Sequence, residues 1–375
     1  LMPDAVNRPH KEVAISPHET PESRAIVHVL HRRNCFLPAT PGGRQTPMAL
    51  LDITDLSVRY AVDDGHVRAV DGVSLAVDQG ATVGLLGESG SGKSTLGRAI
   101  PRLLDPAGEI TEGTIHFDGR DLTALSEAAL RDLRWAEIAL VPQEAMSALN
   151  PAYTVGEQIA ETIRHHEPET DPATADERAA DLLSQMGVAP KRAESYPHQL
   201  SGGTRQRAVL AMALACDPAL IIADEPTTGL DPIMQDRVLA ELVAADAALL
   251  LVTHDVSVIA ETCDRVGVLY GGKMMEVGPT EAVLGTPANP YTMGLKNAVP
   301  NGSGDRLVSI PGDPPDLHTP PDGCRFRDRC PFVTETCETE HPPLYRVADG
   351  HQSACYHLDR VAEMRAAAAE AETWR

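Results

Sequence analysis

The stretch Gly87-Glu88-Ser89-Gly90-Ser91-Gly92-Lys93-Ser94-Thr95 decides the fold of this chain. Two glycines separated by four residues and followed by Lys and a hydroxyl residue are typical of a phosphate-binding loop. Apolar residues 81–86 predict a buried strand before the loop, and residues 96–100 begin an apolar helical face that Pro101 should end. In this context Lys93 is expected to contact the β- and γ-phosphates and Ser94 to bind Mg²⁺. A glycine-rich turn with an incidental lysine is the alternative.

Length and composition limit what can surround the loop. The 375 residues, 42% of them hydrophobic, allow one large α/β domain and a smaller unit. No apolar run reaches the length of about 18 residues that a membrane span needs, so a membrane role must come through a partner. The 54 acidic residues against 32 basic ones give a net charge of −22, which disfavours nucleic acid as a partner. Only five lysines occur, a balance typical of proteins that work in molar salt; an ordinary acidic protein is the alternative.

The first 47 residues are rich in Pro, His and Arg and show no periodicity. They predict a disordered extension, or a start site placed too early, since Met48 directly precedes the first regular strand. They lack the apolar core of a secretory signal. From residue 51 the apolar positions alternate, and residues 51–60, 67–70 and 73–77 predict an antiparallel β-unit. Tyr60 in this unit is either a packed strand aromatic or a stacking surface for a base.

Polar residues end several predicted strands after the loop. Gln143 follows the apolar residues 138–141, at the strand end where open α/β sheets bind ligands. Residues 155–195 predict a helical insertion with a polar break at 165–174. Residues 201–203, a serine and two glycines, then precede a helical stretch and predict a second anion-binding surface at its start.

Two adjacent carboxylates and a histidine end the next two predicted strands. Asp224 and Glu225 follow the apolar residues 220–223, and His254 follows residues 249–252. An aspartate there suits a Mg²⁺ shell and a glutamate suits polarising a water for attack on a phosphate. Solvated loop acids and an ordinary polar histidine are the alternatives.

Taken in order, these motifs resemble the ATP-binding cassette family across residues 51–275. The resemblance implies an α/β P-loop NTPase core with an antiparallel β-subdomain and a helical subdomain. It implies nucleotide contacts from Tyr60, from Gly87, Glu88, Ser89, Gly90, Ser91, Gly92, Lys93, Ser94 and Thr95, and from Ser201, Gly202, Gly203 and Asp231. It implies Mg²⁺ ligation by Ser94, Gln143 and Asp224, and catalytic roles for Glu225, His254 and Gln143. Residues 200–206 correspond to the signature motif of the family. Because the chain has one phosphate loop and one signature motif, the resemblance implies a second cassette that completes each site.

Four cysteines cluster in the Pro-rich region that follows Gly278, at Cys324, Cys330, Cys337 and Cys355. Disulfides are rare in proteins that are not exported, so a metal site is the better explanation. Four thiolates can hold either a structural zinc or an iron–sulfur cluster. Their spacing lacks the short CxxC pairs typical of zinc.

Segments 289–292, 310–312 and 324–331, with 143–151 and 196–200, resemble the oligopeptide/dipeptide importer ATPases, so the resemblance covers about residues 50–358. It implies an ATP-binding domain over 48–278, a small cysteine-containing extension over 279–358 and a helical tail over 359–375. The extension can hold a [4Fe–4S] cluster, with Zn²⁺ or unliganded thiols as the alternatives. The implied function is ATP hydrolysis at the cytoplasmic face of a membrane. It would drive import through two permease subunits, served by an extracellular solute-binding protein. Peptides are the expected solute, with sugars or nickel complexes as alternatives, and a soluble cassette ATPase acting on ribosomes or DNA is the alternative of another class.

Overall fold

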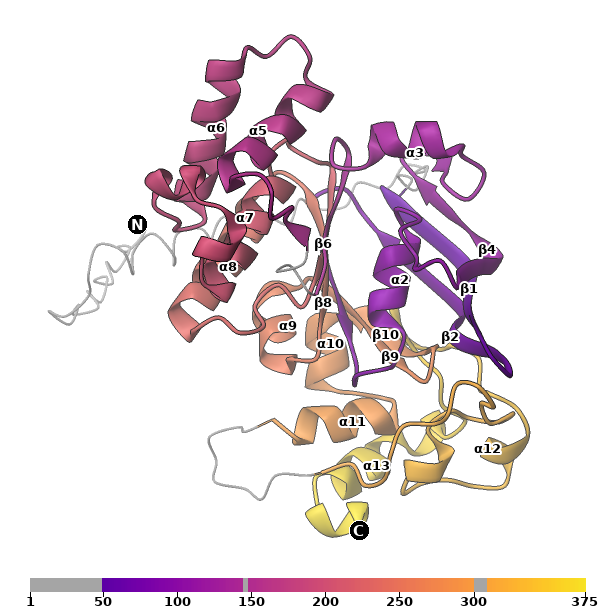
Figure 1. Ribbon diagram of the computed structural model, residues 1–375. Coiled ribbons are helices and arrows are strands. Elements are labelled where there is room, and N and C mark those ends of the chain that lie inside the picture. The colour runs from indigo at the N-terminus through magenta and orange to yellow at the C-terminus, as the bar shows by residue number, and fades with distance from the viewer. Residues whose placement is uncertain (1–48, 144–147, 300–308) are drawn as a thin grey trace, which may run out of the picture. The chain divides into compact units, whose positions relative to one another are not determined.

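The computed structural model describes residues 49–143, 148–299 and 309–375. All of them lie in one compact unit, residues 48–375. The expected N-terminal extension, residues 1–47, lies outside the described residues. Two sheets and a set of short helices build the described part (Figure 1).

The first sheet is antiparallel, with the strand order β2-β1-β4-β5. Its strands are β1 (Leu51–Val62), β2 (Gly65–Val77), β4 (Gly108–Phe117) and β5 (Arg120–Asp121). Residues 67–70 and 73–77, expected as separate strands, form one continuous strand β2 instead. A register shift opposite Leu56 and Val58 absorbs the polar residues between them, and Gly72 N–H donates to Ser57 Oγ at 3.1 Å. The antiparallel unit before the phosphate loop is confirmed.

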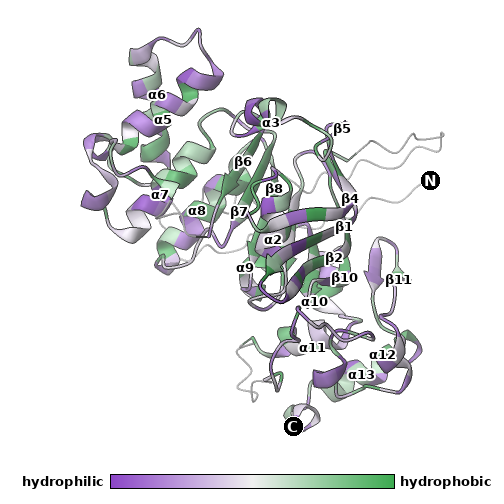
Figure 2. Ribbon diagram, turned by 45° about the vertical axis from the view of Figure 1, so that its right-hand side comes forward, coloured by the Kyte–Doolittle hydropathy of each residue, from purple (hydrophilic) through white to green (hydrophobic). Residues whose placement is uncertain are grey.

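The second sheet has eight strands in the order β11-β12-β10-β9-β3-β8-β7-β6. Its parallel part comprises β9 (Arg265–Tyr270), β3 (Thr82–Leu86), β8 (Ala248–Thr253), β7 (Leu220–Asp224) and β6 (Ile138–Val141). Strands β10 (Lys273–Pro279), β12 (His351–Ser353) and β11 (Tyr345–Ala348) extend it antiparallel. Figure 2 shows hydrophobic residues along β6, β7 and β8, as expected for parallel strands covered on both faces.

Helices cover this sheet and form a separate group beyond β6. They are α2 (Lys93–Ala99), α3 (Glu127–Leu133), α5 (Val155–His166), α6 (Pro172–Gln185), α7 (Gly202–Ala213), α8 (Pro232–Ala244), α9 (Val256–Thr262), α10 (Thr280–Gly285), α11 (Pro290–Asn297), α12 (Thr336–Thr339) and α13 (Val361–Ala368). Helix α2 ends just before Pro101, as expected. Thr154 forms a capping box at the start of α5. The polar break that follows this helix contains Asp171, which caps the start of α6.

The C-terminal region packs into the same apolar core as the nucleotide-binding sheet. Tyr291, Phe326 and Trp374 belong to one continuous buried cluster with Leu86 and Ile221 of the sheet. The cassette and the C-terminal region therefore share one core. The tail is helical, as expected, and its Trp374 is buried with Nε1 donating to Ala368 O at 2.9 Å.

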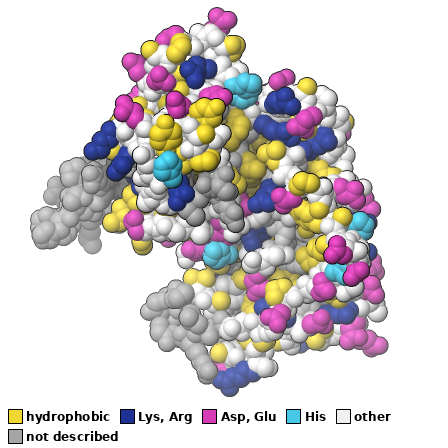
Figure 3. All heavy atoms as spheres, in the orientation of Figure 1, with side chains coloured by type: hydrophobic (Ala, Val, Ile, Leu, Met, Phe, Trp, Pro, Cys, Tyr) yellow, Lys and Arg dark blue, Asp and Glu magenta, His cyan; other side chains and the backbone are white. Residues whose placement is uncertain are grey.

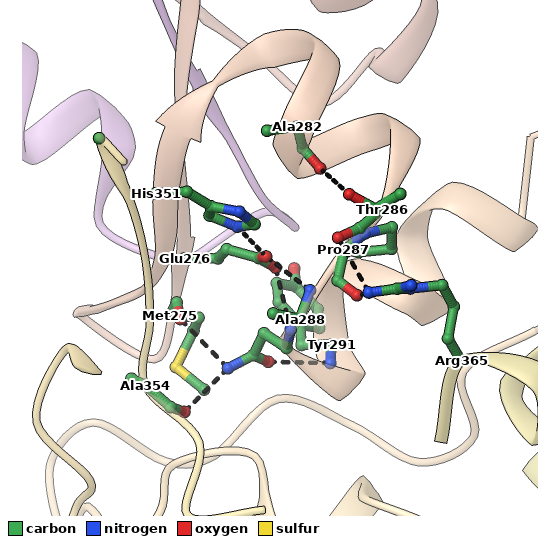
Figure 4. A network of polar contacts seen from close by, with 12 residues as sticks. Met275, Glu276, Ala282, Thr286, Pro287, Ala288, Tyr291, His351, Ala354 and Arg365 are labelled. Atoms are coloured by element: carbon green, nitrogen blue, oxygen red, sulfur yellow. Dashed lines mark hydrogen bonds and ion pairs between the residues drawn. The ribbon is translucent and has the colours of Figure 1, made fainter. Parts of the chain in front are cut away.

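A buried carboxylate joins β10, the start of α11 and β12 (Figure 4). Glu276 is fully buried and accepts hydrogen bonds from Ala288 N at 2.7 Å and Asn289 N at 3.1 Å, and it lies 2.7 Å from His351 Nε2. The amide of Asn289 donates in turn to the carbonyls of Met275 and Ala354. These contacts fix the C-terminal region to the edge of the large sheet.

Candidate functional site

The phosphate loop connects β3 to α2 and depends on its glycines. Gly92 has a φ of 101°, in the left-handed region, and a Cβ there would lie 2.3 Å from Ala69 O. A Cβ at Gly87 would lie 2.2 Å from Leu269 O. The loop can therefore take this course only with glycine at both positions.

The side chain of Lys93 folds back onto the phosphate loop. Its Nζ donates to Gly87 O at 2.7 Å, to Glu88 O at 2.8 Å and to Ser91 Oγ at 3.3 Å. Burial lowers the pKa of Lys93, while the charges of Glu225 and two other carboxylates oppose that shift. A buried ammonium held by neutral oxygens is well placed to meet an anion entering the loop.

Asp224 lies beside the loop with one oxygen unused. Ser94 Oγ donates to Asp224 Oδ1 at 3.0 Å, whereas Asp224 Oδ2 is buried and has no hydrogen-bond partner among the described atoms. Burial raises the pKa of Asp224, and the hydrogen bond from Ser94 works in the opposite direction. A buried carboxylate oxygen without a partner next to a hydroxyl suits a hard cation such as Mg²⁺.

Glu225 and His254 meet because β7 and β8 are neighbouring parallel strands. Glu225 Oε1 accepts a hydrogen bond from His254 N at 3.1 Å and lies 2.7 Å from His254 Nδ1. Thr228 Oγ1 donates to the other oxygen at 3.2 Å. Glu225 is buried and has a φ of 51°, a costly conformation for a residue other than glycine. The structure thus brings together the two acids and the histidine that the sequence indicated.

The remaining nucleotide residues of the sequence prediction lie farther out. Gln143 lies two residues after β6 and is exposed, and half-buried Tyr60 lies on β1 against Gly108. Ser201 is the N-cap of α7, where its Oγ accepts from Thr204 N, and the exposed Asp231 is the N-cap of α8. Residues 202 and 203 form the first turn of α7. The structure therefore places all of these residues at strand or helix ends or on the antiparallel sheet.

The four cysteines of the C-terminal region line one small cavity of about 20 Å³. Burial raises the pKa of Cys324 and Cys355 to about 11, and the other thiols lie close enough to add to the shift. Cys324 N–H also donates to Cys337 O at 2.8 Å. Within the described residues, no group of three or more His, Cys, Asp or Glu is arranged to hold a metal ion. The thiols therefore converge without forming a tight single-ion site.

Two residues that touch the phosphate loop were missed by the sequence analysis. Arg329 bonds to the carboxylate of Glu88, and the hydroxyl of Tyr291 accepts a hydrogen bond from Glu88 N. Both lie in segments that the sequence analysis had singled out for other reasons. The position of Arg329 directly before Cys330 was visible, but no spacing rule connects it to the loop.

A phosphate loop between β3 and α2, with paired acids at the end of β7, defines a P-loop nucleotide-binding cassette. Family comparison agrees: residues 70–228 match the family described as ABC transporter, and residues 275–337 match the oligopeptide/dipeptide transporter C-terminal region. The dipeptide transport ATP-binding protein DppD of Escherichia coli (strain K12) is 43% identical over 318 residues, which is 83% of this chain and 97% of that protein. DppD of Bacillus subtilis (strain 168) is 41% identical over 324 residues, 84% of this chain and 96% of that protein.

A solved structure of similar fold is a dimeric ATP-binding cassette in a post-hydrolysis state with ADP and Pi. It matches with a TM-score of 0.57 and 27% identity, covering 61% of this chain and 98% of that chain. The chain belongs to the ABC transporter ATPases of the oligopeptide/dipeptide group. No helix in the described part of the chain is long and apolar enough to cross a membrane.

Proposed function

We propose that this chain hydrolyses ATP to drive import of di- or oligopeptides, acting as one of two cassettes that close on ATP at the cytoplasmic face of a membrane. The observation that carries the proposal is the buried Asp224 carboxylate beside Ser94 and the phosphate loop, whose Oδ2 has no hydrogen-bond partner within the described residues. Such an oxygen needs a cation, and nucleotide phosphates bring Mg²⁺ with them.

Each residue of the site has a part in this reaction. The loop N–H groups and Lys93 would bind the phosphates. Ser94, Asp224 and Gln143 would hold Mg²⁺, which neutralises charge on the β- and γ-phosphates. Glu225 would accept a proton from the attacking water, and His254 would contact the γ-phosphate while its main chain orients Glu225.

The placement of the signature motif, residues 200–206, and of Asp231 supports a second cassette. Ser201 and Asp231 are exposed helix caps, open to another chain, and residues 202–203 start a helix whose N–H groups suit phosphate oxygens. The dimeric state of the structurally similar cassette supports the same arrangement. We infer that Tyr60 stacks on adenine, that two permease subunits bind the dimer, and that an extracellular solute-binding protein delivers the solute.

Peptides are favoured as solute by the match of residues 275–337 and by the similarity to dipeptide transport proteins. Sugars or nickel complexes are the alternative solutes, and a soluble cassette ATPase is a more distant alternative. Uptake of labelled dipeptides and tetrapeptides by vesicles holding the assembled transporter tests the choice. Uptake of a labelled sugar or nickel complex, with no peptide uptake, would replace the peptide assignment.

Glu225→Gln tests the hydrolytic mechanism. The variant keeps the size of the side chain but removes the base, so kcat should fall by about 10²- to 10⁴-fold while ATP still binds. Lys93→Ala is the comparison variant, since removal of the ammonium group should weaken ATP binding, which Glu225→Gln should leave intact. The measurement is phosphate release by the assembled transporter with the sister cassette disabled. Undiminished hydrolysis by the Glu225 variant would refute the assignment.

We further propose that the four cysteines hold a [4Fe–4S] cluster, with Zn²⁺ as the alternative. Four thiols that line one cavity, together with apolar side chains such as Met275 and Phe326, support a site to which all four could contribute. Anaerobically purified protein should contain about four irons and four sulfides per chain and absorb near 400 nm. Replacing Cys355 by Ser should remove the absorbance near 400 nm. Stoichiometric zinc without iron would favour the zinc site.

We also propose that the acidic surface is adapted to high salt. The chain has a net charge of −22, and Asp and Glu side chains are spread over the face shown in Figure 3. Such a surface repels itself at low ionic strength and disfavours nucleic acid as a partner.

A further inference from the structure

Glu88, the second residue of the phosphate loop, is held by two residues of the C-terminal region. Its backbone N–H donates to the Tyr291 hydroxyl at 2.9 Å. Its carboxylate accepts two hydrogen bonds from Arg329, Nη1 to Oε2 at 2.6 Å and Nη2 to Oε1 at 3.0 Å. A two-point pair of this kind fixes both the distance and the plane of the carboxylate. The main chain and the side chain of one loop residue are thus held from 203 and 241 positions away.

The guanidinium of Arg329 is itself fixed in place. Its Nη1 donates to the Tyr270 hydroxyl at 3.1 Å and its Nε to Pro311 O at 2.8 Å. It lies over the rings of Tyr270 and Phe326, with centroid distances of 5.5 Å and 6.0 Å. Only 6% of the side chain is exposed. Arg329 is therefore held in one position by hydrogen bonds, ring contacts and burial.

Arg329 and a second arginine, Arg325, lie in the same turn, residues 324–330, which we call the cysteine segment. Arg329 directly precedes Cys330, and Arg325 directly follows Cys324. Arg325 pairs with Asp71 on β2 at 2.5 Å and is also buried. The turn that carries two of the four cysteines therefore attaches to the cassette by two ion pairs, and only the pair made by Arg329 is with a residue of the phosphate loop.

We propose that Arg329 is a positioning residue for nucleotide binding, which, together with Tyr291, holds Glu88 and so keeps the phosphate loop in the conformation that binds ATP. The same contact neutralises a carboxylate that would otherwise repel the triphosphate. Since Arg329 adjoins Cys330, the folded state of the cysteine segment sets the affinity of the cassette for ATP. The C-terminal region is then part of the nucleotide site as well as a structural extension.

The test compares MgATP binding by the full-length wild type and Arg329→Gln, using titration calorimetry. The dissociation constant should rise on the order of tenfold, which corresponds to about 1.4 kcal/mol. In the assembled transporter kcat at saturating ATP should stay within about twofold, because Arg329 touches no reacting atom, while KM for ATP rises. Arg329→Lys should fall between the two, since an ammonium cannot bond both carboxylate oxygens in one plane.

Arg325→Gln is the matched control. It removes a buried ion pair of the same segment, so its melting temperature should fall much as that of Arg329→Gln does. Its ATP affinity should stay within about twofold of wild type. Equal weakening of ATP binding by both variants would overturn the proposal, because general loosening of the segment would then explain the effect.

Two further variants keep the proposal open to refutation if Arg329→Gln does not fold. Tyr291→Phe removes only the hydroxyl that accepts Glu88 N–H, and it should weaken MgATP binding by a few-fold. Unchanged affinity in this variant would overturn the proposal. Glu88→Gln combined with Arg329→Lys should weaken ATP binding by clearly less than the sum of the two single effects, because both changes affect one pair. Strict additivity would contradict a joint role.

Discussion

Replacing Glu276 should separate the C-terminal region from the edge of the large sheet. This carboxylate is fully buried and faces Ala288 N, Asn289 N and His351 Nε2 (Figure 4). In Glu276→Gln the shape is kept, but one oxygen becomes an NH₂ group that faces a hydrogen-bond donor. In Glu276→Ala all three contacts are lost and a cavity is left.

The expected loss of stability follows from counting these contacts. One buried donor left without an acceptor costs about 1–3 kcal/mol, so Glu276→Gln should lose about that amount. Glu276→Ala leaves more donors unpaired and should lose about 3–5 kcal/mol. Exposed Glu281 lies nearby on α10, and Glu281→Gln should change stability by less than about 0.5 kcal/mol.

Urea unfolding of the full-length chain measures these differences from the transition midpoints. Limited proteolysis should at the same time show residues 309–375 cleaved earlier in the Glu276 variants than in the wild type. If Glu276→Gln is as stable as the wild type, the carboxylate does not hold the region to the sheet, and the reasoning from its three contacts is wrong.

Two further predictions concern solution conditions. Stability should rise from low salt towards molar KCl, because screening reduces repulsion within a chain of net charge −22; a flat or falling thermal melt would contradict the salt adaptation. Burial, together with the charges of Lys273 and Arg325, lowers the pKa of His341 to about 4. The unfolded chain therefore protonates His341 more readily than the folded chain does. The free energy of unfolding should fall by about 3 kcal/mol as the pH drops from about 6.5 to 4. His341→Gln should remove that part of the acid loss in melts at pH 4.5 and 7.5, and an unchanged acid loss would show that His341 does not cause it.

The parts of the site that are local in sequence could be predicted from it. The phosphate loop needs glycines at fixed spacing between a strand and a helix, so residues 87–95 carry their own structural context. The two acids at the end of β7 were likewise visible because a buried apolar strand precedes them. The prediction of two separate strands at 67–70 and 73–77 was wrong, because they form one strand with a register shift. A register shift depends on the pairing of two strands and has no clear signal in the sequence of one.

Contacts between distant segments could not be predicted in the same way. Arg329 and Glu88 are 241 positions apart, and His351 and Glu276 are 75 apart. Each residue alone is an ordinary charged or polar side chain, and only the packing of the C-terminal region against the sheet brings the partners together. A core continuous from the cassette to Trp374 was hidden for the same reason, since aromatic residues are few and widely spaced.

The pairing of β12 with β10 also affects how the chain avoids aggregation. Without the C-terminal region, β10 would present a row of unpaired N–H and C=O groups at the margin of a hydrophobic sheet, a template for joining another chain. In the folded chain β12 pairs with β10 at Glu276 and Val277, and β11, which has four residues, is the outermost strand. A chain cut after residue 279 should therefore aggregate on expression. The C-terminal region in this way covers an edge strand that could otherwise pair with another chain.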